Sequence, residues 1–466
     1  MIIKQFYLGC LAHASYLVVD ERTKTAAVVD PQRDVDQYVA EAERLGAKIK
    51  YVLLTHFHAD FVAGHLELRD RLGARIYIGA KAEAEYDATN LADGDVLEFG
   101  DVRLEIMETP GHTPEGISIA AYDLAASDVR PRAVFTGDTL FVGDVGRPDL
   151  LGSIGFTAEQ LASQLYDSLH GKLMKLPDET VVYPAHGAGS LCGKALGKEN
   201  FSTIGEQRRF NYALQPMSRE EFTRIVTADQ PDAPAYFLHD AILNRKERET
   251  LDTTLAKSLA GLSLDQVLAL QEDGAFVVDV RPAADFEGAH LDGSVNIALE
   301  GKFATWAGTL IAPDATIVVV AEPGTEEEAA MRLGRIGLDH VAGYVKGGMA
   351  ALENRPDLIA SSRRVTAQAL ADILRHADAP LVVDVRAEKE YEGGHIAGSK
   401  NVPLNKLEAR IAEVPRDSEV VVVCRSGYRS STAASILRRH GYTHVSDLVG
   451  GMDAWSASDL PVAAMA

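Results

Sequence analysis

The sequence predicts a multidomain α/β protein, and three observations lead to this prediction. The chain has 466 residues, enough for about three domains at roughly 150 residues each. A stretch at residues 277–299 returns at residues 382–404, so the last part of the chain consists of two copies of one unit. Before residue 250, many short strand-like segments end in His, Asp or Gly, which is a different pattern. We therefore expect one N-terminal domain followed by a tandem pair.

The tandem copies read "VVDVRPAADFEGAHLDGSVNIAL" and "VVDVRAEKEYEGGHIAGSKNVPL". In each copy, β-branched runs alternate with helical patterns, which is typical of a parallel sheet with helices on both faces. We interpret the repeated polar residues mainly as groups that hold the fold. These residues are Asp279, Arg281, His290 and Asn296 in the first copy and Asp384, Arg386, His395 and Asn401 in the second.

Domain boundaries are expected where polar and breaker residues cluster, in "LDTTLAKSLAGLS" near residue 255 and in "ENRPDLIASSRR" near residue 360. This gives an N-terminal domain at 1–250, a first repeat at 258–358 and a second repeat at 362–466. Within the first domain, helices are expected at 34–45 and 157–169, and the opening residues read as a pair of short strands.

Composition excludes several functions. Lys and Arg number 46 against 68 Asp and Glu, and the net charge of −22 repels nucleic acid and anionic lipid surfaces. Apolar runs are too short for a membrane span, and no cleavable leader is recognised. Three cysteines, Cys10, Cys192 and Cys424, suit a reducing compartment rather than a disulfide framework. We expect a cytoplasmic protein without nucleic-acid or membrane partners.

Candidate metal ligands stand at the ends of the N-terminal strands. They are His56, His58 and Asp60 in "THFHAD", His112 in "PGHT", Asp138 in "TGDT" and His186 in "YPAHG". Imidazoles and carboxylates carried on several loops converge at one edge of a sheet, so the four motifs together predict a metal site.

These motifs, in this order, resemble the metallo-β-lactamase superfamily over about residues 1–245, which implies an αββα fold. In two-metal members, the position of Phe61 holds a histidine that helps to bind the second ion. A phenyl ring donates nothing to a cation, so we expect one metal. The resemblance and the open 2-His-1-carboxylate set of His56, His112 and Asp138 imply Fe(II), one per chain.

A branch of that superfamily, the persulfide dioxygenases, is similar in several further stretches, including "DPQRDVDQY", "FVGDVGRPDL" and "YPAHGAGSLCGK". The branch implies mononuclear iron, with His58, Asp60 and His186 around the ligands, where they orient ligands or substrate.

Two residues near the predicted site have two interpretations each. Arg147 could pair with an anionic substrate or form a structural ion pair with Asp144 or Asp149. Cys192, six residues after His186, could handle persulfide or serve as a small apolar loop residue. Cys10 is expected to pack in a strand-like segment.

The second repeat contains "EVVVVCRSGYRSSTAASILRRHG", which predicts a buried strand, a loop from Cys424 to Arg429 and a helix from about Ser430. A thiol at a helix N-terminus meets unpaired N–H groups, and Arg425 and Arg429 add positive charge. The loop therefore predicts a reactive thiolate that accepts sulfur.

The repeat resembles the rhodanese family, with C-x4-R spacing rather than the C-x5-R of related phosphatases. In the first copy, Ala321 stands opposite Cys424, and Glu322 and Glu326 stand opposite the two arginines. Without the nucleophile and with acids that repel anions, the first copy is expected to be an inactive rhodanese-like scaffold.

Together these features predict oxidation of a low-molecular-weight thiol persulfide by O2 to sulfite, coupled to sulfane-sulfur transfer between Cys424 and sulfite or thiosulfate. One alternative is a thioester hydrolase of the glyoxalase II type, which uses a metal-activated water. Another is a non-catalytic sulfur carrier. The identity of the thiol, the direction of transfer, weak binding of a second metal and a homo-oligomeric state are open alternatives.

Overall fold

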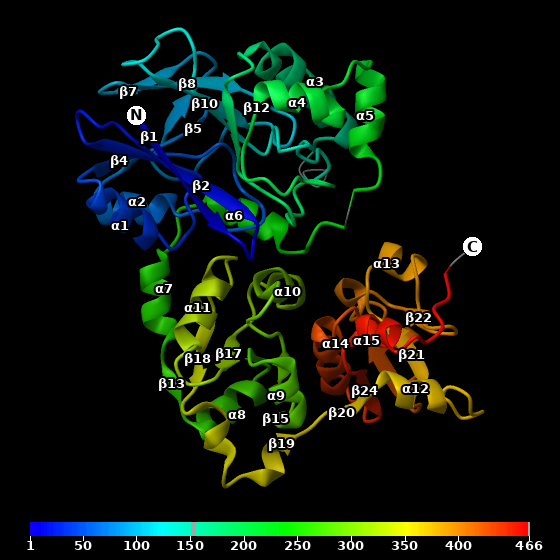
Figure 1. Ribbon diagram of the computed structural model, residues 1–466. Coiled ribbons are helices and arrows are strands. Elements are labelled where there is room, and N and C mark those ends of the chain that lie inside the picture. The colour runs from blue at the N-terminus through cyan, green and yellow to red at the C-terminus, as the bar shows by residue number, and fades with distance from the viewer. Residues whose placement is uncertain (151–154, 231, 465–466) are drawn as a thin grey trace. The chain divides into compact units, whose positions relative to one another are not determined.

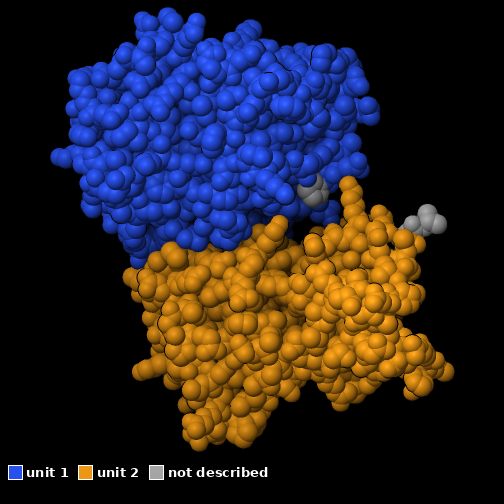
Figure 2. Space-filling view, viewed as in Figure 1, with its two compact units in different colours: residues 1–253, 334–337 blue, residues 254–333, 338–466 orange. Residues whose placement is uncertain are grey.

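The structure is a computed structural model that describes residues 1–150, 155–230 and 232–464. The chain divides into two compact units, residues 1–253 with 334–337 and residues 254–333 with 338–466 (Figure 2). None of the helices in the described ranges combines the length and the apolar character that crossing a bilayer requires.

Unit 1 contains two sheets, each with six strands within the described residues (Figure 1). The first is ordered β1 (Ile2–Leu8), β2 (His13–Val19), β3 (Thr25–Val29), β4 (Lys48–Leu53), β5 (Arg75–Gly79) and β6 (Thr89–Leu91). The second is ordered β12 (Ser202–Thr203), β11 (Val181–Pro184), β10 (Ala133–Gly137), β9 (Ile117–Asp123), β8 (Val102–Glu108) and β7 (Val96–Phe99). Strands β3 to β6 and the pair β10–β11 are parallel, whereas the remaining neighbours are antiparallel.

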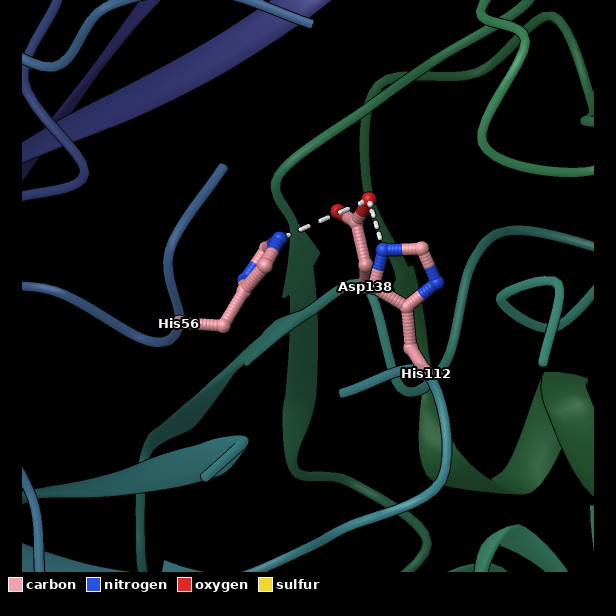
Figure 3. Close-up of side chains that lie close together, drawn as sticks. All are labelled: His56, His112 and Asp138. Atoms are coloured by element: carbon pink, nitrogen blue, oxygen red, sulfur yellow. Dashed lines mark ion pairs between the residues drawn. The ribbon is translucent and has the colours of Figure 1, made fainter. Parts of the chain in front are cut away.

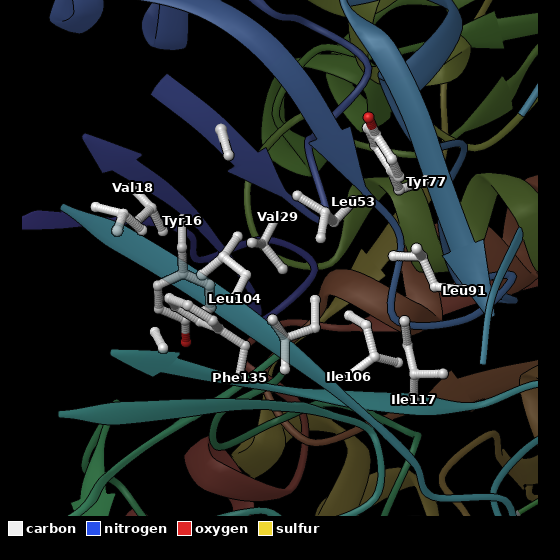
Figure 4. Close-up of a cluster of buried hydrophobic side chains, with 14 of the residues drawn as sticks. Tyr16, Val18, Val29, Leu53, Tyr77, Leu91, Leu104, Ile106, Ile117 and Phe135 are labelled. Carbon is white, nitrogen blue, oxygen red and sulfur yellow. The ribbon is translucent and has the colours of Figure 1, made fainter. Parts of the chain in front are cut away.

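The apolar core of unit 1 is built from side chains of both sheets (Figure 4). The first sheet contributes Tyr16, Val18, Val29 and Leu53, and the second contributes Leu104, Ile106, Ile117 and Phe135. Alternation along each strand sends these residues to one face, where the removal of apolar surface from water stabilises the stack.

Helices cover the outer faces of this stack (Figure 1). Against the first sheet lie α1 (Asp36–Arg44) and α2 (His65–Leu72). Against the second lie α3 (Ala158–Gly171), α4 (Ile204–Phe210) and α5 (Arg219–Thr227). Helix α6 (Phe237–Arg245) contacts the segment between β4 and α2 instead, because Asn244 hydrogen-bonds the backbone of His58, Phe61 and Ala63. The predicted α/β architecture is confirmed, with the N-terminal unit layered αββα.

One local expectation in unit 1 is wrong. The opening residues form the expected pair of strands, but Cys10 lies in the turn between β1 and β2 and is partly exposed. The four residues between the two strands are needed to reverse the chain, so Cys10 is not packed inside a strand.

Unit 2 contains two parallel sheets with the same strand order, five strands each in the described residues. The first copy is ordered β13 (Gly261–Leu262), β18 (Val341–Val345), β17 (Ile317–Val320), β14 (Phe276–Asp279) and β16 (Val295–Asn296). The second is ordered β20 (Arg363–Val365), β24 (Val445–Leu448), β23 (Val420–Val423), β21 (Leu381–Asp384) and β22 (Lys400–Asn401). The central strands are runs of buried valine and isoleucine, as expected for sheets covered on both faces.

The helices of unit 2 lie between these strands in sequence. They are α8 (Leu264–Glu272), α9 (Ala283–Gly288), α10 (Phe303–Leu310) and α11 (Glu326–Gly334) in the first copy, preceded by α7 (Leu251–Ser258). The second copy has α12 (Ala367–Ile373), α13 (Glu388–Glu392), α14 (Tyr428–Arg439) and α15 (Gly451–Ala457). A short ladder of β15 (His290–Leu291) and β19 (Ile359–Ala360) completes the unit.

The repeated polar residues make contacts inside each copy. The Arg281 guanidinium lies 2.6 Å from the Asp279 carboxylate, and the Arg386 guanidinium lies 2.6 Å from the Asp384 carboxylate. Both arginines also donate to a backbone carbonyl eight residues further along. These buried pairs agree with the interpretation that they hold the fold.

Candidate functional site

Three strand ends of unit 1 bring His56, His112 and Asp138 together (Figure 3). His56 follows β4, His112 follows β8 and Asp138 follows β10 directly. The Oδ2 atom of Asp138 lies 3.4 Å from Nε2 of His112 and 3.8 Å from Nε2 of His56. All three side chains are buried, so the fold gathers the three predicted metal ligands in one pocket.

The chemistry of this group fits a divalent cation. Asp138 Oδ2 is buried and has no hydrogen-bond partner in the part of the chain that the structure describes. Burial lowers the pKa of His56 and of His112, so both imidazoles are neutral and can donate a lone pair. Although burial acts to raise it, nearby histidines hold the pKa of Asp138 well below its ordinary range. Two neutral imidazoles and one carboxylate thus face one point.

Hydrogen bonds fix the direction of both imidazoles. Thr55 donates its hydroxyl to Asp30 over 2.8 Å, so this oxygen accepts from His56 Nδ1, 3.0 Å away. His112 Nδ1 donates to the backbone carbonyl of Arg147 over 2.8 Å. Because Nδ1 carries the proton in each ring, Nε2 presents its lone pair toward Asp138.

Gly146 allows the ligand-bearing segments to approach each other. A Cβ atom at this position would lie 1.9 Å from the carbonyl oxygen of Asp138 and 3.0 Å from Cβ of His112. The first distance is far below any van der Waals contact, so only glycine fits between these two ligands.

Asp60 and His186, two further candidate ligands beside Asp138, are hydrogen-bonded to carboxylate or imidazole partners. His186 lies 2.8 Å from Asp138 Oδ1 through Nδ1 and 2.8 Å from Asp60 Oδ2 through Nε2. Although burial opposes it, Asp138 and Asp60 raise the pKa of His186 well above its ordinary value. His186 is therefore an imidazolium that bridges two carboxylates, and both its nitrogens are engaged.

Phe61 closes the same region. Its ring is 2% exposed and its centroid lies 3.9 Å from that of His13 and 4.5 Å from that of His58. His58 in turn places Nε2 3.1 Å from Asp30 Oδ1. The space beside His186 is thus filled by aromatic rings.

Sequence reasoning missed His13, Thr55 and Asp30. His13 is fully buried, its ring packs at a tilt against that of Phe61, and its backbone forms an isolated β-bridge with His186. Its position at the start of a strand gave no signal, because the pairing with a segment more than 170 residues away arises only in the fold. Asp30 did carry a signal, since it ends the strand-like run "AAVVD".

Arg147 and Cys192 lie next to the pocket. The Arg147 guanidinium donates two hydrogen bonds to Asp149, of 2.8 and 2.7 Å, and its side chain is 2% exposed. These contacts are those of the structural ion pair. Cys192 is buried with its sulfur near Asp60 and His186. Burial, together with the two nearby carboxylates, raises the pKa of the Cys192 thiol well above its ordinary value.

In unit 2, Cys424 follows β23 and its sulfur faces the start of α14. The backbone N–H of Gly427 donates to Sγ over 3.1 Å, and Ser430 Oγ lies 3.4 Å away. The helix begins at Tyr428, two residues before the predicted start, because Gly427 adopts a left-handed φ of 106° and opens the first turn. The sulfur thus lies at a helix N-terminus.

The two predicted arginine partners of Cys424 differ in their surroundings. Arg429 donates hydrogen bonds of 2.7 and 2.9 Å to Glu390 and is mostly buried. Arg425 is 72% exposed and lies 3.5 Å from Asp453. Arg429 is held rigidly beside the thiol, whereas Arg425 extends into solvent.

The first copy keeps the shape of this loop without its chemistry. Ala321 follows β17 as Cys424 follows β23, and Gly324 has a left-handed φ of 97°, close to that of Gly427. Ala321 provides no thiol, and α11 begins with Glu326, Glu327 and Glu328.

Comparison with known families identifies three regions. The model of the metallo-beta-lactamase superfamily matches residues 8–186. The model of the rhodanese-like domain matches twice, at residues 263–355 and 366–458. The first match contains all three residues of the predicted metal site, and the last contains Cys424.

Individual relatives share these regions. The mitochondrial persulfide dioxygenase ETHE1 of Homo sapiens is 30% identical over 228 residues, which are 48% of this chain and 80% of that protein. The cytoplasmic hydroxyacylglutathione hydrolase of Arabidopsis thaliana is 37% identical over 187 residues, 40% of this chain and 67% of that protein. A crystal structure of a metallo-beta-lactamase from Staphylococcus aureus is 31% identical with a TM-score of 0.65, and the match covers 74% of this chain and 98% of that one.

Proposed function

The chain belongs to the metallo-beta-lactamase superfamily, and two rhodanese-like domains follow that domain in the sequence. We propose that the protein is a persulfide dioxygenase coupled to a sulfurtransferase. The observation that carries the proposal is a single open ligand group, His56, His112 and Asp138, beside a second group whose histidine is held by two carboxylates. A one-metal site with open positions suits O2 chemistry better than hydrolysis by paired ions.

His56, His112 and Asp138 would hold Fe(II), one per chain, which when bound would activate O2 toward the persulfide, while the electrons that reduce O2 come from the terminal sulfur. The Thr55 hydroxyl and the Arg147 carbonyl keep both imidazoles directed at the site. Phe61 and His13 fill the neighbouring space and exclude water from it. His186 holds a proton between Asp60 and Asp138 and neutralises part of their charge.

The overall reaction at unit 1 is RSSH + O2 + H2O → RSH + SO3²⁻ + 2H⁺, in which the terminal sulfur is oxidised and O2 is reduced. At unit 2, the Cys424 thiolate attacks the sulfane sulfur of thiosulfate, the S–S bond breaks, and Cys–SS⁻ and sulfite form. In the reverse direction, a persulfide first loads the cysteine (RSS⁻ + Cys–S⁻ → RS⁻ + Cys–SS⁻), and sulfite from unit 1 then takes the sulfane sulfur, which forms thiosulfate and restores the Cys424 thiolate. The Gly427 N–H and the positive end of α14 stabilise the anionic sulfur in either direction.

A second candidate is a thioester hydrolase, favoured by the 37% identity with the hydroxyacylglutathione hydrolase. That reaction would use a metal-activated water at the same ligands. The aromatic Phe61 and the engaged nitrogens of His186 disfavour a paired-ion site. The dioxygenase is therefore the better supported proposal.

The test is purification under argon with metal counting, followed by oxygen-electrode assays on glutathione persulfide and analysis of sulfite and thiosulfate. We expect about one iron per chain and O2 uptake that is lost in His112→Ala but kept in Cys424→Ser and in His440→Ala, a matched change of an exposed histidine. Two zinc ions per chain with equal turnover of a thioester under argon would contradict the proposal.

A further inference from the structure

The helix that follows the catalytic cysteine is shared between the two rhodanese-like copies. Helix α14 packs on β23 and β24 of its own copy and on β16 and α9 of the cysteine-free copy. Every residue from Ser430 to Leu437 is buried, and four of these are serine or threonine. Small polar groups in such a buried place need hydrogen-bond partners.

Several of these partners belong to the cysteine-free copy. Ser431 Oγ donates to Asn296 Oδ1 over 2.9 Å, and the backbone N–H of Asn296 donates to Ser435 Oγ over 3.1 Å. The hydroxyl of Tyr428 donates to the carbonyl of Ala298 over 2.8 Å. A stretch of three residues at the end of β16 thus holds α14 at its first and second turns.

Tyr428 connects this contact to the sulfur. It is the first residue of α14 and follows Gly427, whose N–H donates to Cys424 Sγ. Burial raises the pKa of Tyr428, so its hydroxyl stays protonated and donates. The corresponding position of the first copy is Thr325, which has no phenol. The tyrosine thus anchors the turn that cradles the thiol in the second copy.

Asn296 makes two kinds of hydrogen bond, and comparison with Asn401, the equivalent residue of the second copy, distinguishes them. Its Nδ2 donates to the carbonyls of Asp279 and Arg281, both over 3.0 Å, and Asn401 makes the equivalent bonds in the second copy over 2.9 Å. In the described residues, Asn296 additionally accepts from α14 through Oδ1. Asn296 thus stabilises the first copy through Nδ2 and contacts helix α14 of the second copy through Oδ1.

We propose that the cysteine-free copy is a positioning element of the Cys424 site, in which Asn296 and the carbonyl of Ala298 fix the first turn of α14 and keep the Gly427 N–H directed at sulfur. Tyr428 and Ser431 are the positioning residues on the helix side. This inference rests on the proposed sulfurtransferase function, and it gives the copy without a nucleophile a role beyond that of a spacer.

The test uses full-length Tyr428→Phe and Ser431→Ala, with Thr432→Ala as the matched control. Thr432 is buried like Ser431, but its hydroxyl donates to the Tyr428 carbonyl within α14. The readouts are kcat and KM for sulfur transfer from thiosulfate to cyanide, and the pH dependence of Cys424 alkylation by iodoacetamide followed on the Cys424 peptide. Thermal unfolding reports any general loss of stability.

We expect kcat to fall about 3- to 10-fold in Tyr428→Phe and Ser431→Ala, with KM within about twofold of wild type. The alkylation midpoint should move to higher pH, because a thiolate that loses its N–H donor is less favoured. Arg429 and Ser430 also face the sulfur and are unchanged in these variants, so the shift reports on the Gly427 N–H. Thr432→Ala should leave kcat and the midpoint unchanged.

Unaltered kcat and alkylation midpoints in both variants would overturn the proposal, as would equal changes in Thr432→Ala that track its melting temperature. Failure of the proposed function is distinguishable. If the wild type transfers no sulfur at all, the sulfurtransferase assignment falls, while the alkylation midpoints still report whether the first copy positions the loop.

Discussion

Metal stoichiometry is the most direct prediction from unit 1. For a second ion to bind, His186 must release Asp60 or Asp138 and lose a proton, because both its nitrogens are engaged at 2.8 Å. Removing one partner from a buried charged pair costs about 3–5 kcal/mol. At about 1.4 kcal/mol per decade, a second ion should bind roughly 100- to 3,000-fold more weakly than one at the first site.

The assay is titration of the metal-free protein with Fe(II) under argon, with counting of bound metal after dialysis. We expect one tightly bound ion per chain in the wild type. The variant Phe61→His restores an imidazole beside His186 but does not release that residue, so it should also retain one tight ion. Two ions of equal affinity in the wild type would refute the reasoning, and a second tight ion in Phe61→His would show that the ring alone had blocked the site.

Two further predictions concern unit 2. Burial raises the pKa of the facing carboxyls Glu287 and Asp447, so the folded state holds extra protons and stability falls as pH rises from the ordinary carboxyl range through the raised values. The wild type should therefore lose melting temperature between about pH 5 and pH 8. In Asp447→Asn this loss should be smaller, by about 2–4 °C for each kcal/mol of pH-dependent unfolding free energy that the substitution removes. An equal loss in both proteins would contradict this. Ala321→Cys in a Cys424→Ser background should transfer sulfur at below about one hundredth of the wild-type rate, because acids occupy the arginine positions; recovered thiosulfate turnover would refute that argument.

Much of the architecture could be predicted from sequence because the signals were local. The tandem copies follow from a repeated stretch, and the ligand motifs stand where strands end, so their convergence needed only the rule that strand ends share an edge. The strand-end pattern supplied the candidate ligands, and the resemblance to the persulfide dioxygenases singled out His56, His112 and Asp138 among them. The start of α14 was placed two residues late, because a single left-handed glycine at Gly427 begins the helix without a capping side chain.

The remaining features depend on contacts between distant segments. His13 reaches the site because β2 lies beside the residues around His186, and no periodicity reports such a pairing. The bridging role of His186 depends on two carboxylates that lie 48 and 126 residues away in sequence. The serine and threonine residues of α14 carry no sequence signal for a partner, yet in the fold Ser431 donates to Asn296 of the other copy.

The close approach at Gly146 means that the metal centre has a requirement that no inventory of donor atoms reveals. A single methyl group there would clash with the backbone carbonyl of Asp138 and crowd Cβ of His112, so these two ligands would move apart although neither side chain had been changed. A random search for chains that fold but no longer retain metal should therefore recover changes at this position, and grafting the centre onto another scaffold would require this close backbone approach as well as the three side chains.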